Sequence, residues 1–371
     1  MTNPPLVHGL DANLVPPDWP APDPADLELV LAAYGLRPGQ LPSWLSPRPL
    51  ASSLLVSTSA GQVFVKRSNH RVRDAEGLRE EHRFAEHLRS TGISTPEVLY
   101  TSEGDTVFAR GKWCYEVHAP AVGVDRYRDA MSWTPFDTPA EARSAGRSLA
   151  LFHAAAATFT ASRRTTEVLT SRPDALLAGS IRTAIVEFAT TRPAAEVILA
   201  AARQSDLEYL DSLLDTVAQP LRSLRQQWTH NDWHASNLFW RGSEVSSVID
   251  FGLADLSYAV VDLAIAIERN MIRWLELPHP EISESTSTAE LLAGYEDVTH
   301  LTAAEAALLP DLLPVIHLDF ALSEVDYFAG VLADPNRGTV AWRDYAVGHA
   351  NWFTTEQGRT FQHLVRTCLL R

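Results

Sequence analysis

The chain has 371 residues, of which 46% are hydrophobic and 21% charged, and its formal net charge is −15. This length and hydrophobic content allow one large or two modest domains with a sizeable core, so global disorder is excluded. The acidity makes nucleic acid and anionic membranes poor partners, because both would repel the chain at long range. The N-terminal residues lack the pattern of a signal peptide, and no apolar run reaches the roughly 18 residues of a membrane span, so we expect a cytoplasmic protein.

The N-terminal third is predicted to be a small α+β unit. Residues 1–25 contain seven prolines and are expected to form an extended arm. Apolar residues at helical spacing predict helices at 26–34 and 75–90. Alternating and β-branched residues predict strands at 54–56, 62–66, 97–100, 106–109 and 113–117. We therefore expect a five-stranded antiparallel sheet with one main helix over residues 26–118.

The rest of the chain is predicted to be a larger, mainly helical domain. Pro120 and Gly123 indicate a linker, so this domain is placed at residues 119–371. Helical patterns cover 139–157, 175–190, 194–226 and most of 255–371. Strand and turn residues at 228–253 interrupt them.

This interruption carries a group of polar residues with regular spacing. Residues 229–238 read THNDWHASNL, and the strand that follows ends in Ile-Asp-Phe-Gly, with the aspartate at position 250. Asp232 precedes Asn237 by five positions, and Asn237 precedes Asp250 by thirteen. Short Asp, Asn and Gly clusters also form ordinary polar turns. The combined pattern H-x-D-x-H-x-x-N and D-F-G, however, resembles the catalytic and metal loops of the protein-kinase-like fold.

The variant of this pattern is similar to that of small-molecule kinases, namely aminoglycoside phosphotransferases, choline kinases and type II homoserine kinases. The resemblance implies a two-lobe α+β fold with ATP and Mg²⁺ bound between the lobes, and GTP is not excluded. Asn237 and Asp250 would supply the oxygen ligands that Mg²⁺ prefers. Asp232 would then accept the hydrogen bond and proton of the substrate hydroxyl.

The resemblance also implies a nucleotide site in the smaller domain. Lys66 ends a predicted strand, where the family places its phosphate-binding lysine, and Glu81 is the candidate glutamate that pairs with it. Single charged residues at such positions are otherwise ordinary solvated groups. The glycine-rich loop of protein kinases is absent from the sequence. Ser52 and Ser53 are therefore the candidates that donate hydrogen bonds to the phosphates of the nucleotide.

Other positions are assigned by analogy with the family alone. The carbonyl group of Glu116 and the N–H group of His118 are expected to bind the adenine. His230 is expected to support the catalytic loop, and Asp262 to accept hydrogen bonds from loop N–H groups. His153 is expected to be a packed structural histidine.

The acceptor is expected to lie between the catalytic loop and the C-terminal helices. His317 and Glu324 are seven residues apart in a predicted helix and so share one face. They could bind a cationic or hydroxylated acceptor, although a solvated acidic face is the simpler interpretation. Trp233 could form an aromatic wall or pack within its loop, and His234 could contact substrate or brace the loop.

The sequence therefore predicts a kinase that phosphorylates a hydroxyl of a small molecule: an amino alcohol, an amino acid, a sugar or an aminoglycoside-like antibiotic. Two alternatives stay open, a serine/threonine protein kinase and a non-catalytic nucleotide-binding pseudokinase. The absence of an A-P-E segment disfavours the first, and the presence of all four expected polar residues (Lys66, Asp232, Asn237, Asp250) disfavours the second. The oligomeric state is left open.

Overall fold

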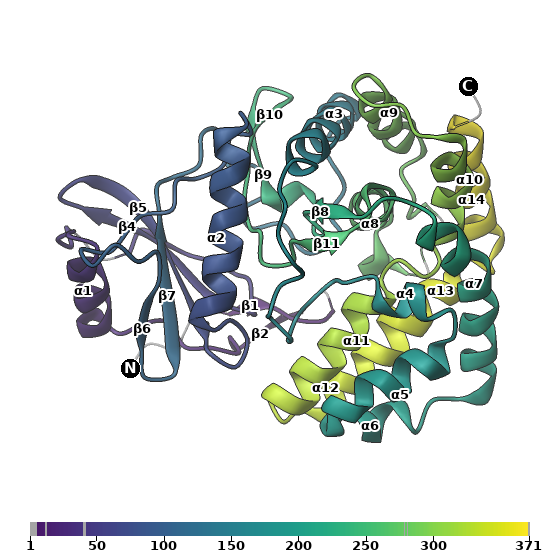
Figure 1. Ribbon diagram of the computed structural model, residues 1–371, viewed down its shortest axis with the longest axis horizontal. Coiled ribbons are helices and arrows are strands. Elements are labelled where there is room, and N and C mark those ends of the chain that lie inside the picture. The colour runs from purple at the N-terminus through teal and green to yellow at the C-terminus, as the bar shows by residue number, and fades with distance from the viewer. Residues whose placement is uncertain (1–5, 12, 40–41, 278, 280, 370–371) are drawn as a thin grey trace.

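The computed structural model describes residues 6–11, 13–39, 42–277, 279 and 281–369. A sheet domain and a larger helical domain lie side by side (Figure 1), as the two-lobe α+β prediction requires. Five antiparallel strands follow the spatial order β3-β4-β5-β7-β6. Their bounds are β3 (Trp44–Leu45), β4 (Ser52–Thr58), β5 (Gly61–Asn69), β6 (Phe108–Arg110) and β7 (Trp113–His118).

One predicted strand differs from the structure. Residues 97–100 form no strand of their own, and only Val98 makes an isolated bridge, to His118. The fifth strand is instead β3, which has only two residues and is too short to show alternation in the sequence. Pro96 precedes residues 97–100 and has no N–H group to donate to a strand ladder. This explains in part why these residues do not form the predicted strand.

Two helices cover opposite faces of the sheet. Helix α1 (Pro24–Ala33) packs its buried Val30 and Leu31 against apolar side chains of β4, β5 and β7. Helix α2 (Ala75–Ser90) begins at Asp74, whose side chain accepts a hydrogen bond from Gly77 N and caps the helix. Because side chains alternate along a strand, the residues of β5 and β7 that do not face α1 face α2 and the helical domain.

The N-terminal arm contacts both domains. Within it, β1 (Val7–His8) and β2 (Leu14–Val15) form a short antiparallel pair. Further along, the Asp18 carboxylate pairs with Arg337 at 2.6 Å, and Trp19 Nε1 donates to the Tyr327 hydroxyl at 3.0 Å. The arm therefore joins the sheet domain to the C-terminal helices.

The helical domain is built around a tight helix pair. In α3 (Pro139–Ala156) and α9 (Ser285–Glu296), Gly146 and Gly294 face each other's helix so closely that a Cβ on either would clash with a backbone carbonyl. The remaining α-helices are α4 (Asp174–Ala178), α5 (Ile181–Thr191), α6 (Pro193–Leu199), α7 (Gln204–Arg222), α8 (Ala259–Met271), α10 (Ala303–Leu312), α11 (Leu318–Asp326), α12 (Pro335–Val340), α13 (His349–Trp352) and α14 (Glu356–Cys368). Short 3₁₀ segments lie at η1 (Ala235–Asn237) and η2 (Trp274–Glu276), and π-helical segments at η3 (Tyr327–Val331) and η4 (Ala341–Gly348).

Two small hairpin-like sheets lie where the domains meet. One pairs β8 (Gln227–Thr229) with β11 (Asp255–Ser257), and the other pairs β9 (Leu238–Arg241) with β10 (Glu244–Val248). The polar segments at residues 230–237 and 249–254 connect these strands. They therefore lie close to the sheet domain (Figure 1).

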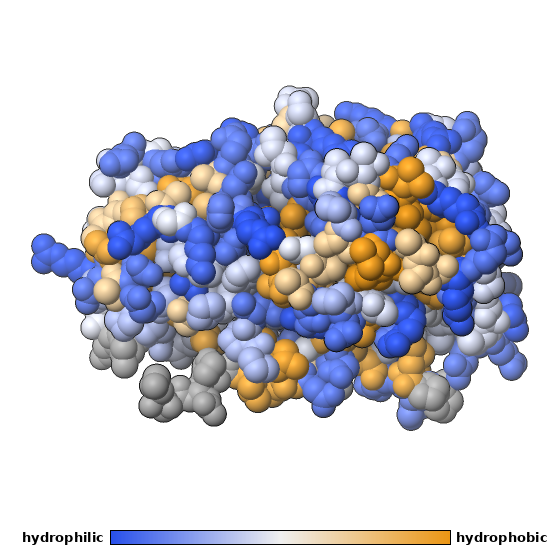
Figure 2. Space-filling model, turned by 90° about the horizontal axis from the view of Figure 1, so that it is seen from below, coloured by the Kyte–Doolittle hydropathy of each residue, from blue (hydrophilic) through white to orange (hydrophobic). Residues whose placement is uncertain are grey.

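Hydrophobic residues reach the surface in separate patches between hydrophilic ones on the face seen in Figure 2. Within the described part of the chain, no helix is both long enough and apolar enough to cross a membrane.

Candidate active site

Asp232 lies at the centre of the loop between β8 and η1. Its Oδ1 accepts a hydrogen bond from Arg269 at 2.6 Å, and its Oδ2 lies 3.4 Å from His234 Nε2. Asn237 Nδ2 donates to the backbone oxygen of Asp232 at 3.0 Å and to its Oδ2 at 3.1 Å. The structure thus brings Asp232 and Asn237 together, as the spacing of the motif predicts.

Helix α8 holds the beginning of this loop. The Asp262 carboxylate accepts hydrogen bonds from His230 N at 2.8 Å and Asn231 N at 2.9 Å. His153 Nε2 contacts the same carboxylate at 3.0 Å from its buried position in α3. Asn231 has a positive φ of 59°, a conformation that asparagine tolerates better than most residues. The predicted structural roles of Asp262 and His153 are therefore confirmed.

The same helix also holds the second half of the loop. Asn270 Oδ1 accepts a hydrogen bond from Ala235 N at 2.8 Å, and its Nδ2 donates to Trp233 O at 2.8 Å. One helix therefore fixes the loop on both sides of Asp232, and a rigid support of this kind positions a catalytic group accurately.

The loop after β10 presents Asp250 to the sheet domain. His230 Nε2 contacts Ile249 O at 3.0 Å, which joins this loop to the first and confirms the scaffolding role of His230. Asp250 itself has a φ of 60°, a strained conformation for this residue. Its Oδ1 accepts hydrogen bonds from Lys66 Nζ at 3.0 Å and Gly252 N at 3.3 Å.

The charges of this site hold both aspartates ionised. Burial opposes ionisation of Asp232, but Arg269 and His234 outweigh it and keep the pKa of the carboxyl well below its usual range. Burial likewise opposes ionisation of Asp250, and the Lys66 ammonium lowers its pKa. The negative charge of Asp232 acts to raise the pKa of Asp250, so the two carboxylates are close enough to interact electrostatically.

Asp250 and Asn237 each carry a second oxygen atom of the kind that binds divalent cations. Lys66 and Gly252 both donate to Asp250 Oδ1, so neither of these two hydrogen bonds uses Oδ2. Asn237 donates to Asp232 through Nδ2, so this hydrogen bond does not use its carbonyl Oδ1. One carboxylate and one amide oxygen on neighbouring loops fit Mg²⁺, which takes few protein ligands and keeps several waters.

Lys66 and Glu81 do not pair as expected. In the described part of the chain Lys66 makes its ion pair with Asp250, while Glu81 is bound by Arg164 at 3.2 Å. Arg164 also donates to the backbone oxygens of Gly77 and Gly252, so it occupies the space between α2 and the Asp250 loop. A guanidinium with five donors satisfies this position better than an ammonium could.

The other residues assigned to the nucleotide lie near Lys66 but in strands. Ser52 and Ser53 are buried at the start of β4, with Ser53 directly opposite Lys66, rather than in a turn. Glu116 is the partner of Lys66 in β7. Leu99 N donates to Val117 O, and alternation then directs the backbone groups of residues 116 and 118 toward β5. The ladder therefore uses the groups that were expected to bind adenine, which corrects that prediction.

The four residues assigned to the acceptor are placed differently: His234 lies beside Asp232, with 3.4 Å between Nε2 and Oδ2, Trp233 packs within the loop, and His317 and Glu324 lie next to each other. Trp233 is fully buried, with its ring 5.5 Å from that of His230, so it packs in the loop and forms no wall of the site. His317 and Glu324 lie together, with 3.9 Å between Nε2 and Oε2. Glu324 also acts electrostatically on Arg269.

Sequence reasoning missed two arginines of this region. Arg269 lies over the rings of Trp133 and Phe320, at 5.5 and 5.9 Å from their centroids. Arg48 reaches from the sheet domain to Ser236 Oγ at 2.8 Å. Arg269 follows Asp262 by seven residues in α8, hence on the same face, and this spacing was the available indication.

Comparison with known proteins gives consistent results. A model described as "Phosphotransferase enzyme family" matches residues 50–301. A homoserine kinase of Xanthobacter autotrophicus is 27% identical over 314 residues, which cover 81% of this chain and 85% of that protein. A homoserine kinase of Methylocella silvestris is 28% identical over 322 residues, 84% of this chain and 89% of the other.

Solved structures share the fold. A microcompartment-associated aminopropanol kinase superimposes with a TM-score of 0.59 at 17% identity, over 91% of this chain and 99% of that one. An amicoumacin kinase in complex with AMP-PNP and Ca²⁺ gives 0.57 at 14% identity, over 92% and 93%. The two-lobe architecture predicted from the motifs is therefore confirmed.

Proposed function

Since the chain belongs to the phosphotransferase enzyme family and is a small-molecule kinase, we propose that it transfers the γ-phosphate of ATP to the hydroxyl of a small zwitterionic acceptor. In this proposal residues 26–118 bind the nucleotide, and residues 119–371 hold the catalytic and acceptor groups. The observation that carries the proposal is the arrangement of Asp232, Asn237 and Asp250 around one site that Lys66 also reaches.

The nucleotide end of the site consists of Lys66, Asn237 and Asp250. Lys66 would bind phosphate oxygens, and Asn237 and Asp250 would hold Mg²⁺, which when bound would supply positive charge beside the transferring phosphoryl group. On nucleotide binding, Lys66 exchanges part of its contact with Asp250 for phosphate. The relative whose structure contains AMP-PNP and Ca²⁺ supports a nucleotide and a divalent ion in this fold.

Asp232 acts on the acceptor hydroxyl. Phosphoryl transfer has a loose transition state, so orienting the hydroxyl matters more than removing its proton early. A carboxylate with a low pKa, held by Arg269 and Asn237, suits this task because its position is fixed and its charge is constant. The proton passes to Asp232 as the new oxygen–phosphorus bond forms.

The charges beside Asp232 favour an acceptor with both signs. Arg48 and Arg269 are partly buried on this side of the site, and Arg269 is close enough to act electrostatically on Arg48. Glu324, which acts electrostatically on Arg269, has a buried Oε2 that lies 3.9 Å from His317 Nε2 and has no hydrogen-bond partner among the residues that the structure describes. A carboxylate near the arginines and an ammonium near Glu324 would satisfy both groups.

A hydroxylated amino acid has these features, and homoserine is the first candidate because several relatives are named homoserine kinase. An amino alcohol has no carboxylate to pair with Arg48 and Arg269. The ammonium groups of a large aminoglycoside would be repelled by the same two arginines. No observation favours a protein acceptor or a non-catalytic role, the two alternatives that the sequence left open.

The test is an ADP-release assay with ATP and Mg²⁺ on a matched set of acceptors. Homoserine is compared with 3-amino-1-propanol, which lacks the carboxylate, and 4-hydroxybutyrate, which lacks the ammonium. We expect kcat/KM to fall at least about 100-fold for each, because a buried charge then loses its partner. ADP release with none of a wider panel of amino acids, amino alcohols, sugars and aminoglycosides would refute the proposed activity.

A further inference from the structure

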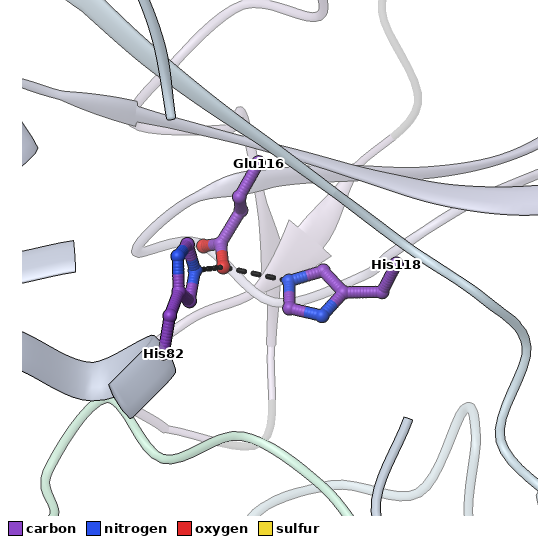
Figure 3. A group of neighbouring side chains, drawn as sticks. All are labelled: His82, Glu116 and His118. Carbon is purple, nitrogen blue, oxygen red and sulfur yellow. Dashed lines mark hydrogen bonds and ion pairs between the residues drawn. The ribbon is translucent and has the colours of Figure 1, made fainter. Parts of the chain in front are cut away.

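A second group of ligand-type side chains lies beside the proposed nucleotide site, between α2 and the sheet. Glu116 and His118 alternate along β7 and so point to the same face, where His82 of α2 meets them. Glu116 Oε2 lies 2.8 Å from His82 Nε2 and 2.7 Å from His118 Nε2 (Figure 3). The ligand atoms of all three lie within 4.8 Å of one another.

The group is deeply buried and incompletely satisfied. Glu116 is 2% exposed and His82 3% exposed. Within the described ranges, neither Glu116 Oε1 nor His82 Nδ1 has a hydrogen-bond partner. Buried carboxylate oxygens are nearly always paired, and an unpaired one costs about 1–3 kcal/mol or more. A cation that contacts both oxygens of Glu116 would remove part of this cost.

We propose that His82 Nε2, His118 Nε2 and the Glu116 carboxylate form a binding site for a divalent metal ion of the zinc class. Two imidazoles and a carboxylate are a ligand set that zinc uses in proteins, with solvent in the remaining position. The metal takes the place of the two hydrogen bonds to Glu116. Each neutral imidazole can carry its single proton on Nδ1, which frees Nε2 without releasing a proton.

The metal can reach this group from solvent. A surface pocket of about 440 Å³ between α2 and residues 96–106 is lined by His82 at one side and includes Val98, the bridge partner of His118. The His118 side chain is itself 19% exposed, so the group is not closed off from solvent.

The other histidine–carboxylate group of the molecule does not fit a metal as well. Glu268 Oε1 already accepts a hydrogen bond from Trp133 Nε1 at 3.1 Å. His317 is held in its cationic form by Glu268. A cationic imidazole has both nitrogens protonated, so this group offers fewer free ligand atoms than the group that contains Glu116.

An ion at this site would have a structural effect on the nucleotide site. It would tie α2 to β7, and Glu116 is the strand partner of Lys66. The ion would thereby fix the strand that carries the phosphate-binding lysine. It is separate from the Mg²⁺ at Asp250, which has oxygen ligands only.

The experiment is a cobalt titration of the full chain after dialysis against a chelator. Excess Mg²⁺ is present so that the oxygen site is occupied, and Co²⁺ is followed by its visible absorption. Wild-type protein is compared with His82→Gln and His118→Gln, and with His87→Gln as the matched control. His87 lies in the same helix but contacts Thr158 and not the proposed site.

We expect one equivalent of Co²⁺ with the absorption of a nitrogen-liganded, four- or five-coordinate ion, and displacement of it by Zn²⁺. His82→Gln and His118→Gln should weaken binding by about 100-fold or more, and His87→Gln should leave it unchanged. Zn²⁺ should also raise the Tm of the wild type by roughly 2–5 °C. Absence of this absorption in the wild type, or equal binding in all four proteins, overturns the proposal. If His82→Gln fails to fold, the more exposed His118 position and the wild-type titration decide.

Discussion

The Lys66 ammonium and the Asp250 carboxylate form an ion pair of 3.0 Å that connects β5 to the loop after β10. Lys66 is 18% exposed in its side chain and Asp250 is 45% exposed, so the pair lies at the edge of the site rather than in the core. Such a pair links the two domains. Because it is accessible to solvent, water or a nucleotide phosphate can take the place of Asp250 as the partner of Lys66.

Lys66→Met should raise the KM for ATP. The substitution removes a charge-assisted contact worth about 1.5–3 kcal/mol, which corresponds to roughly 10- to 100-fold in binding. Steady-state kinetics with varied ATP measure this effect. Lys112→Met is the control, since Lys112 is the only other lysine of the chain and lies near the ring of Trp113. Equal KM values for the two variants would show that Lys66 does not bind the nucleotide.

Glu81→Gln should act on stability more than on nucleotide binding. Glu81 is buried and paired with Arg164, whose guanidinium loses this carboxylate partner in the variant. We expect a lower Tm and a KM for ATP within about threefold of the wild type, in contrast to Lys66→Met. Thermal unfolding and kinetics of the two variants are compared side by side. A KM increase as large as that of Lys66→Met would restore Glu81 as the partner of Lys66.

The sequence predicts the catalytic loops well because their information is local. Residues 229–238 and 249–252 hold the polar motif and the turn residues in two short segments, and strands on either side fix their geometry. The pairing of Asp232 with Asn237 was therefore expected from the spacing of the motif together with its resemblance to kinase loops. The contact of Asp262 with loop N–H groups was expected from the same resemblance.

Long-range partners could not be predicted in this way. Glu81 pairs with Arg164 and not with Lys66. Arg164 and Glu81 lie 83 residues apart in the sequence, and no local pattern links them. Arg48 and Arg269 reach the acceptor side from different domains. Strand β3 was missed because two residues carry no period. These contacts depend on how distant segments pack together. The sequence contains many arginines, and local pattern does not indicate which of them reaches a given carboxylate.

Arg269→Gln should relax the preference for a carboxylate on the acceptor. The variant removes the cation beside Asp232, so homoserine should lose at least about tenfold in kcat/KM. The rate with 3-amino-1-propanol should also fall, because Arg269 holds Asp232 for every acceptor, but by a smaller factor, so the ratio of kcat/KM between the two acceptors should narrow. Arg273→Gln is the control, because Arg273 pairs with Glu284 away from the site. An unchanged ratio would remove Arg269 from carboxylate recognition.

The stability of the protein should fall as the pH rises from about 6.5 to 9. Burial opposes the charge of His317, but Glu268 outweighs it and raises the pKa of His317 to about 9. A raised pKa gives stability that is complete below the unfolded value near 6.5 and is lost as the pH passes the folded value. The loss is on the order of 3 kcal/mol. His349, whose pKa is lowered to about 4, stays neutral over this range.

Urea unfolding at pH 6.5 and 9.5 measures this difference in the wild type and in His317→Gln. The variant should show a smaller fall in the free energy of unfolding between the two pH values. His300→Gln is the control, because the side chain of His300 is 86% exposed. The same fall in His317→Gln and the wild type would mean that His317 is not cationic in the folded protein.

The most direct test of the central claim is phosphoryl transfer by Asp232→Asn. The substitution keeps the size of the side chain and removes the carboxylate that orients the acceptor hydroxyl, so kcat should fall about 10²- to 10⁴-fold. The dissociation constant for the ATP–Mg²⁺ complex should stay within about threefold of the wild type, because Lys66, Asn237 and Asp250 are unchanged. Turnover equal to that of the wild type, with intact nucleotide binding, would contradict the account.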